Sequence, residues 1–451
     1  MSAGVDVASW LASVAPEDLL PTRRRDEAQR IERPLTLVGS AWLDEAHGYA
    51  IVRDARSVTY GIPLAVGAGG LRRAVPGDGT SAALVAQARD AGDVAPEPGI
   101  SGTFALVVPR RGTNGGGEGR APGLTDADEA GIDADQTNDL VVVGAGANRV
   151  VVKWDLHPGS GDQVGPARLA ALARAGFAGT PRTVALVGID VDGERHHVAT
   201  IVEYVPDALD GWDWTVDEVR ALALDGSSRA DESVVAVARI VAGMHVALAS
   251  GPGARASEAD VASWVADADR IVENAELDDD QRAPVTAALA PLARAAGTVV
   301  APIHGDLHVG QILRAGEPTR FLVIDFDGSP TDTPAQRREP QPVARDVASM
   351  LASWDHVGRV VLHRTQGLES AHRERVLAWI ERSQRAFLET YAAELAAAGR
   401  ADLLDRRLVR PYQVLQECRE YAYARRYLPH WRYVPDAALP ALLARPEGSA
   451  A

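Results

Sequence analysis

The segment IHGDLHVGQILRAGEPTRFLVIDFDGSP, residues 303–330, constrains the fold of this chain more than any other part of the sequence. It places Asp306, Gln311 and Asp325 at separations of five and fourteen residues. The apolar run FLVI before Asp325 predicts a strand, and the turn residues ahead of it predict a hairpin over about 312–325. The sequence therefore predicts two carboxylates and an amide around one short hairpin.

This spacing fits phosphoryl transfer. In the protein-kinase superfamily an Asp accepts the proton of the acceptor hydroxyl, a metal ligand follows five residues later, and a second Asp opens the loop after a hairpin. Asp306 is then the candidate base, and Gln311 and Asp325 are candidate ligands for Mg²⁺, which prefers oxygen donors. Taken alone, Asp325 fits equally well an Asp that caps a buried loop. His304 and His308 fit structural roles in the same loop.

Lys153 is the only lysine in the chain, since the other 45 of the 46 Lys+Arg residues are arginine. The residues around it, Val150–Val152 and Trp154, predict a buried strand. Kinases keep a strand lysine for the α and β phosphates of ATP, where a compact ammonium fits and a planar guanidinium does not. The alternative is a solvated surface lysine, which the apolar neighbours disfavour.

The composition excludes several classes of protein. A net charge of −16 argues against nucleic-acid binding, which needs concentrated positive charge. The single cysteine, Cys418, excludes a disulfide framework within the chain and a cysteine zinc cluster. The first residues show no secretory leader, and no apolar run approaches the ~20 residues that cross a bilayer. We expect a cytoplasmic protein.

The order of patterns predicts an α+β protein with several parts. Residues 1–110 predict a helix over about 1–30 followed by a β-rich domain. Residues 111–135 are rich in Gly and acids and predict a flexible linker. Residues 136–205 predict a small β lobe, and residues 206–451 carry the i, i+3, i+4 apolar spacing of helices.

The motifs HGDLHVGQ and IDFDG resemble those of the aminoglycoside-phosphotransferase-like kinases, which have a bilobal, protein-kinase-like fold. Gln311 replaces the usual Asn, a variant typical of the actinobacterial glucosamine kinase and maltokinase group. The segments DQTNDLVVVG (135–144), GMHVALA (243–249) and ARDVASMLASWDH (344–356) are similar to that group as well. The resemblance covers essentially the whole chain, and it identifies residues 1–110 as the group's amino-terminal cap.

The resemblance implies that the protein uses ATP and Mg²⁺. Asp306 would be the catalytic base, and Gln311 and Asp325 the metal ligands. The implied ATP-binding residues are Lys153 at the phosphates, Gln136 and Asn138 in the loop over the phosphates, and the backbone of Glu203 and Val205 at the adenine. An edge strand is the alternative for the segment around Glu203. The helix Glu that these kinases pair with the lysine is absent, and Asp162 and Gln163 are the nearest candidates.

The segment 411–435, PYQVLQECREYAYARRYLPHWRYVP, is the candidate acceptor site. On a helix Gln413, Glu417, Glu420 and Tyr421 share one face, where amides, carboxylates and an aromatic ring suit a sugar. Two carboxylates would also attract an amino group. The alternative is a terminal helix with tyrosines in the core. Trp354 is expected to line the same pocket.

These expectations predict a sugar kinase that converts glucosamine to glucosamine 6-phosphate, with ATP and a small sugar as its only predicted partners. The spacing of QECREYAYARRYLPHW differs from the pattern of the maltokinases, and the resemblance therefore favours the glucosamine kinases. Maltokinase, an aminoglycoside phosphotransferase and a non-catalytic pseudokinase remain the alternatives. The sequence predicts neither nucleic-acid nor membrane partners and leaves the oligomeric state open.

Overall fold

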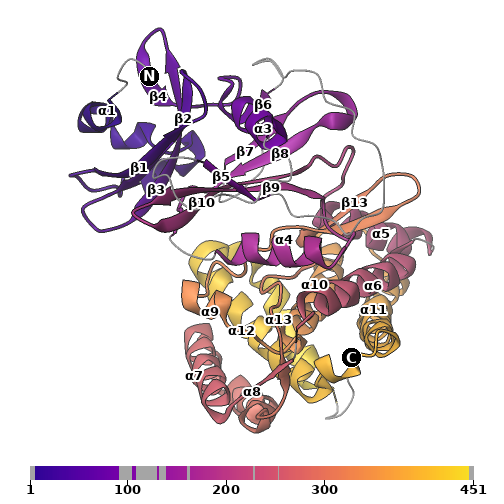
Figure 1. Ribbon diagram of the computed structural model, residues 1–451. Helices are drawn as coiled ribbons and strands as arrows, with labels where there is room; N and C mark the ends of the chain where they lie inside the picture. Colours follow the sequence, from indigo (N-terminus) through magenta and orange to yellow (C-terminus); the bar gives the residue numbers. More distant parts are fainter. Residues whose placement is uncertain are drawn as a thin grey trace. The chain divides into compact units, whose positions relative to one another are not determined.

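The computed structural model describes residues 6–90, 104–107, 129–131, 139–159, 163–226, 229–251 and 253–445. The chain forms two compact units, Met1–Val205 and Pro206–Ala451. The first unit contains two antiparallel sheets and the second is mostly helical (Figure 1).

The first unit begins with a four-stranded sheet in the order β1-β2-β3-β4. Its strands are β1 (Thr36–Trp42), β2 (His47–Arg53), β3 (Thr59–Gly67) and β4 (Gly70–Arg73). Side chains alternate across β2: Ala50 and Val52 pack with the helices before the sheet, and Tyr49 and Ile51 pack with the core of the next sheet. Both faces of the strand are therefore buried.

The second sheet has six strands in the order β5-β9-β10-β8-β7-β6. The strands are β5 (Phe104–Val107), β6 (Glu129–Gly131), β7 (Asp139–Val143), β8 (Val150–Trp154), β9 (Thr183–Val191) and β10 (Glu194–Glu203). The helices of the unit are α1 (Val7–Ser13), α2 (Arg25–Ala28), α3 (Thr80–Asp90) and α4 (Val164–Arg174). Strand β5 falls within the part of the chain assigned to the β-rich domain from the sequence, but it pairs with β9 rather than with the first sheet.

Two local expectations were wrong. The single helix expected over about 1–30 is broken into α1 and α2, because Pro16 and Pro21 fall between them and proline cannot continue a helix. Within the expected linker 111–135, β6 is an ordered edge strand. Its Glu129 carboxylate accepts hydrogen bonds from the backbone N–H groups of Gly77, Gly79 and Ala82 at 2.9, 3.1 and 2.7 Å.

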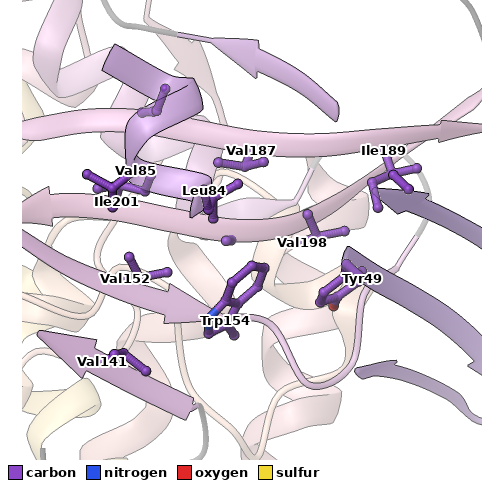
Figure 2. Packing of buried hydrophobic residues seen from close by; sticks show 14 of the residues in the cluster. Tyr49, Leu84, Val85, Val141, Val152, Trp154, Val187, Ile189, Val198 and Ile201 are labelled. Carbon is purple, nitrogen blue, oxygen red and sulfur yellow. The ribbon is translucent and has the colours of Figure 1, made fainter. Parts of the chain in front are cut away.

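One hydrophobic core joins the two sheets of the first unit. Tyr49 and Ile51 of β2 and Leu84 and Val85 of α3 pack with buried residues of β7, β8, β9 and β10 (Figure 2). Figure 2 shows Tyr49 beside Trp154, the last residue of β8. The shared core explains why residues before 110 and after 136 form one compact unit.

The second unit contains nine helices among its described residues. They are α5 (Gly211–Asp225), α6 (Ala230–Leu248), α7 (Glu258–Ala275), α8 (Asp279–Leu289), α9 (Pro334–Arg338), α10 (Ala344–Arg364), α11 (Ser370–Ala397), α12 (Val409–Tyr427) and α13 (Tyr433–Leu443). Two short two-stranded antiparallel sheets accompany them: β11 (Ala254–Arg255) with β12 (Val299–Val300), and the hairpin of β13 (Ile312–Ala315) with β14 (Arg320–Val323).

Helix α10 is the centre of the second unit. It packs against α5, α11, α12 and α13, and most of its residues are buried (Figure 1). Its buried residues include Asp346, Asp355 and His356, which are costly to bury without partners. None of the helices in the described part of the chain combines the length and the apolar character needed to cross a membrane.

Candidate active site

The loop that carries Asp306 is fixed by a buried carboxylate. Asp346, in the first turn of α10, is 1% exposed and accepts hydrogen bonds from the backbone N–H groups of His304 and Gly305 at 2.6 and 2.9 Å. Its Oδ2 also lies 3.0 Å from Nε2 of His245 on α6. Burial opposes the ionised form of Asp346, but the hydrogen bond and charge of His245, and to a smaller extent the backbone donor of Gly305, lower the pKa of this carboxyl.

His304 joins the Asp306 loop to the segment that carries Asp325. Its Nδ1 accepts the backbone N–H of Asp306 at 3.3 Å, and its Nε2 lies 2.8 Å from the carbonyl oxygen of Ile324. One ring nitrogen therefore accepts and the other donates, which assigns the neutral tautomer. Burial lowers the pKa of His304, in agreement with a neutral ring. These contacts agree with the structural role that the sequence predicts for His304, since the ring links two segments of the backbone.

The hairpin β13–β14 returns the chain to Gln311. Ile312 pairs with Val323, and the backbone N–H of Ile324 donates to the carbonyl of Gln311 at 2.9 Å. Asp325 is exposed and adopts a left-handed φ of 62°, an uncommon conformation that Asp tolerates better than most residues. The chain therefore turns out of β14 at Asp325, one residue after Ile324, whose N–H bonds the Gln311 carbonyl.

Gln311 and Asp325 fit a magnesium site. The side-chain amide of Gln311 lies 3.4 Å from Nε2 of His308, whose Nδ1 accepts the backbone N–H of Gly310 at 3.1 Å. Nε2 of a neutral ring is then a donor, which assigns the amide oxygen of Gln311 to that side, and this oxygen keeps a second lone pair for a metal. Among the described residues no cluster of three His, Cys, Asp or Glu side chains is arranged to hold a metal. Mg²⁺ commonly takes one or two protein oxygens and completes its shell with phosphates and water, so two ligands are sufficient.

The pKa of Asp306 is raised. Burial is the main cause, and the negative charges of Asp325 and Asp346 add to it, whereas His308 and His304 oppose it. A raised pKa makes the ionised carboxylate a stronger proton acceptor. Asp306 therefore has the character of a general base, and its backbone is fixed by His304.

A second group of polar side chains lies where α10 faces α12. Nε2 of His356 and Oε1 of Glu417 are 2.9 Å apart, and both residues are buried. Burial alone would lower the pKa of His356, but the Glu417 carboxylate raises it to about 9. Oε2 of Glu417 is buried and has no hydrogen-bond partner among the described residues. The pair therefore presents one unsatisfied acceptor oxygen.

Glu420 and Trp431 extend this group. Nε1 of Trp431 donates to Oε2 of Glu420 at 2.9 Å, and Gln416 donates to Oε1 at 3.0 Å. The ring of Trp431 meets His356 edge-on, with centroids 6.2 Å apart. Carboxylates beside an aromatic ring suit a polyhydroxylated, amino-bearing ligand.

The structure separates the predicted acceptor residues. Gln413, which is buried, Glu417 and Glu420 follow one another along α12, as the helical spacing predicts. Tyr421 instead packs with Val414 and Cys418 in a hydrophobic cluster, and its hydroxyl donates to the carbonyl of Pro435 at 3.2 Å. The structure therefore places Tyr421 in contact with this cluster, and its role in the acceptor site stays a prediction.

Trp354 also lies apart from the pair of His356 and Glu417, and its contacts are with α11. Trp354 is fully buried and meets Trp379 and Phe387 of α11. Two residues further along α10, His356 faces α12 instead, since two helical positions are about 200° apart. His356 was not predicted from the sequence. The signal that could have indicated it is the adjacent pair Asp355 and His356 in the motif SWDH of a buried helix.

In the first unit Lys153 lies in β8, between β7 and β10. Thr200 and Leu140 are its neighbours across the strands. Val152 and Trp154 on either side point into the core, so Lys153 occupies the opposite face of the sheet, where it is half-buried. Helix α4 contains no acidic residue, as the sequence indicates.

The hinge candidates lie at the end of β10. The backbone N–H of Glu203 donates to the carbonyl of Arg182 at 2.9 Å. No backbone hydrogen bond among the described residues uses the N–H of Val205, so this donor is available to a ligand. Gln136, Asn138 and Asp162 lie outside the described residues.

The arrangement of Asp306, Gln311 and Asp325 around one hairpin, and a lysine within a strand of the first unit, match the pattern of phosphotransferases of the protein-kinase-like class. No family model matches the chain. A glucosamine kinase of Streptacidiphilus jiangxiensis is 40% identical over 96% of this chain and 98% of its own length. A glucosamine kinase of Mycolicibacterium smegmatis is 38% identical over 82% of this chain and 90% of its own length.

A solved structure of a glucosamine kinase in complex with glucosamine, ADP and inorganic phosphate has a TM-score of 0.80 to this chain. It is 37% identical and covers 97% of this chain and 99% of its own. The chain belongs to the glucosamine kinase family. The predicted α+β, kinase-like fold and the predicted family are confirmed.

Proposed function

We propose that this protein transfers the γ-phosphoryl group of ATP to the 6-hydroxyl of glucosamine, giving glucosamine 6-phosphate and ADP. The observation that carries the proposal is the connected set Asp306, Gln311 and Asp325, joined through His304 and the backbone of Ile324. The names of the relatives and the glucosamine and ADP in the related complex support the acceptor and the donor. Because ATP is a metabolite of the cell interior, we propose the cytoplasm as the compartment.

We propose that Asp306 accepts the proton of the 6-hydroxyl as its oxygen attacks the γ-phosphorus. The new O–P bond forms while the bond from phosphorus to the bridging oxygen breaks, and ADP departs with that electron pair. A bound Mg²⁺ neutralises charge on the phosphates, and Gln311 and Asp325 would hold it. The hydrogen bonds of Asp346 and His304 keep the base at a fixed position while the proton moves.

We propose that the first unit supplies the nucleotide contacts. The ammonium of Lys153 would bind the phosphates, and the backbone of Glu203 and Val205 would bind the adenine. The available N–H of Val205 supports the latter assignment. Gln136 and Asn138 remain the residues proposed for the loop over the phosphates.

We propose that α12 recognises the sugar. The unpartnered Oε2 of Glu417 would accept a hydrogen bond from the 2-ammonium group, because a charge-assisted hydrogen bond satisfies an otherwise unsatisfied buried oxygen. Gln413 and Glu420 would bind hydroxyl groups, and Trp431 would contact the apolar face of the ring. His356 stabilises the charge of Glu417 when no ligand is bound.

The experiment is an ADP-release assay with glucosamine, glucose, maltose and a panel of aminoglycosides, with and without a chelator of Mg²⁺. We expect the highest kcat/KM for glucosamine and loss of turnover on chelation. Turnover of maltose but not glucosamine would reject the acceptor. Nucleotide binding without turnover of any acceptor would reject a catalytic role altogether.

A further inference from the structure

The four residues that follow Lys153 are each held by the amino-terminal part of the chain. We use "cap" here for the described residues 6–90. Trp154 donates from Nε1 to the hydroxyl of Ser81 on α3 at 3.0 Å. Its ring also stacks on Tyr49 of β2, with centroids 5.4 Å apart and planes 15° from parallel (Figure 2). The side chain next to the lysine is therefore fixed by the cap on two sides.

The next two residues are held through their carbonyl groups. The Tyr49 hydroxyl donates to the carbonyl of Asp155 at 2.7 Å, and the backbone N–H of Gly61 donates to the carbonyl of Leu156 at 3.0 Å. Burial raises the pKa of Tyr49 well above its ordinary value, so the hydroxyl stays a donor. A Cβ at Gly61 would collide with the Tyr49 hydroxyl and with the Asp155 carbonyl, so the close approach requires glycine.

His157 completes the series. Its Nε2 lies 2.6 Å from Oε1 of Glu27 on α2, and its Nδ1 lies 3.1 Å from the carbonyl oxygen of Thr59 on β3. Both partners are acceptors, so only the doubly protonated ring satisfies both. Burial disfavours that form, but the hydrogen bond to Glu27 outweighs it and raises the pKa of His157.

We propose that Tyr49 and Ser81 of the cap are positioning residues for Lys153, and that the cap thereby sets the affinity for ATP. The proposal rests on the proposed role of Lys153 in binding the phosphates. Lys153 itself is placed by strand pairing to Thr200 and Leu140, and pairing to β7 and β10 continues through Trp154, the last residue of β8. The cap contacts at residues 154–157 hold the chain at the point where it leaves the sheet.

The same contacts explain why a cap is present. A compact ammonium binds a phosphate strongly only when it is held at the correct place, and displacement by ~1 Å can cost ~10²-fold in rate or affinity. A lysine side chain has a long flexible stem, so its anchor in the backbone is the part that the fold can fix. The cap contacts act on that anchor.

The test compares a double variant, Tyr49→Phe with Ser81→Ala, with the wild type in the full-length protein. The two changes remove the hydroxyls that contact residues 154 and 155 and keep the packed rings and backbone. The matched control is Thr80→Val, which removes a neighbouring buried hydroxyl on α3 that bonds the carbonyl of Leu64 instead. The wild type, the double variant, Thr80→Val and Lys153→Met are each assayed for kcat, for the KM of ATP and for the KM of glucosamine.

We expect the double variant to raise the KM for ATP about tenfold, to keep the KM for glucosamine, and to speed amide exchange over residues 151–157. Thr80→Val should leave all three unchanged. In the Lys153→Met background the two cap changes should add nothing, because they act through the lysine. If the double variant fails to fold, Ser81→Ala alone carries the same comparison.

Three results overturn the inference, and they separate it from the proposed function. If the cap changes raise the KM for ATP equally with and without the lysine, they act elsewhere. If the double variant keeps a normal KM for ATP while Lys153→Met raises it, the lysine binds ATP without help from the cap. If Lys153→Met leaves the KM for ATP unchanged, the proposed role of Lys153 fails, and the inference fails with it.

Discussion

His356 on α10 and Glu417 on α12 form a buried pair, with 2.9 Å between Nε2 and Oε1. Only one carboxylate oxygen of Glu417 is used by this pair, and the other has no partner among the described residues. A buried ion pair needs further hydrogen bonds to offset its loss of water. A ligand with an ammonium group can supply the hydrogen bond that Glu417 lacks.

The first prediction is that Glu417→Gln weakens glucosamine binding selectively. Loss of a charged hydrogen bond, ~1.5–3 kcal/mol, should raise the KM for glucosamine about 10- to 100-fold. The KM for ATP should stay unchanged, since Glu417 lies in the second unit on α12 and is proposed to touch only the sugar. Steady-state kinetics with each substrate varied in turn gives both values.

The control for Glu417→Gln is Tyr421→Phe on the same helix. It removes a hydroxyl that bonds the Pro435 carbonyl in the hydrophobic cluster, so it should lower the melting temperature slightly and keep the KM for glucosamine. An equal rise in KM for both variants would show that α12 is merely destabilised, and the sugar assignment of Glu417 would fall.

The second prediction concerns pH and stability. The pKa of His356 is about 9 in the folded protein against 6.5 as its ordinary value. A group whose pKa is raised on folding contributes stability below the unfolded value and loses it as the pH rises through the folded value. His356 should therefore contribute stability that is fully present below pH 6.5 and is lost as the pH rises through about 9.

Urea unfolding of the wild type and of His356→Gln, at about pH 6 and about pH 10, measures this contribution. The difference in unfolding free energy between the two proteins should shrink at the higher pH. Two stability curves that stay parallel across this range would mean that His356 is neutral in the folded protein.

The third prediction is that Asp306→Asn abolishes transfer and keeps ATP binding. Removal of a general base costs ~10²–10⁴ in kcat. The carboxamide keeps the size of the side chain, so the dissociation constant for ATP should stay within about twofold. ADP-release kinetics and equilibrium nucleotide binding are compared with those of Asp402→Asn, a surface change of the same chemistry. Transfer at the wild-type rate by Asp306→Asn would reject the base.

The pH profile gives a fourth prediction for the same residue. Because burial and neighbouring carboxylates raise the pKa of Asp306, kcat/KM should fall on the acid side at a pH above the ordinary value of an Asp, ~3.9. Activity below this limb is lost because the base is protonated. A limb at or below the ordinary value would assign the proton transfer to another group.

The fifth prediction is that Lys153→Arg does not preserve function although it preserves charge. The planar guanidinium is larger than an ammonium and needs a bidentate partner, so kcat/KM for ATP should fall about 10- to 100-fold. Glucosamine binding should be unaffected. Arg382→Lys, an exposed exchange on α11, serves as the control. Normal ATP kinetics for Lys153→Arg would return Lys153 to the surface-lysine alternative.

Local pattern made much of this protein predictable. The hairpin after Gln311, the buried strand of Lys153 and the long helices of the second unit depend on turn residues and on apolar periodicity, which act over a few residues. The break between α1 and α2 follows from Pro16 and Pro21, so it could have been predicted from the sequence. The strand at 129–131 could not be predicted from local pattern, because the contacts of Glu129 with residues 77–82 are made only after folding.

The sequence alone determined which residues are proposed for the chemistry, namely Asp306, Gln311, Asp325 and Lys153, because their types and spacings are local. Which side chains meet across elements was decided by the tertiary structure. It turned Tyr421 and Trp354 into core residues, it paired His356 with Glu417 across two helices, and it joined the cap to residues 154–157. The physical reason is that helical phase and strand order bring distant residues together, and neither is encoded at any one position.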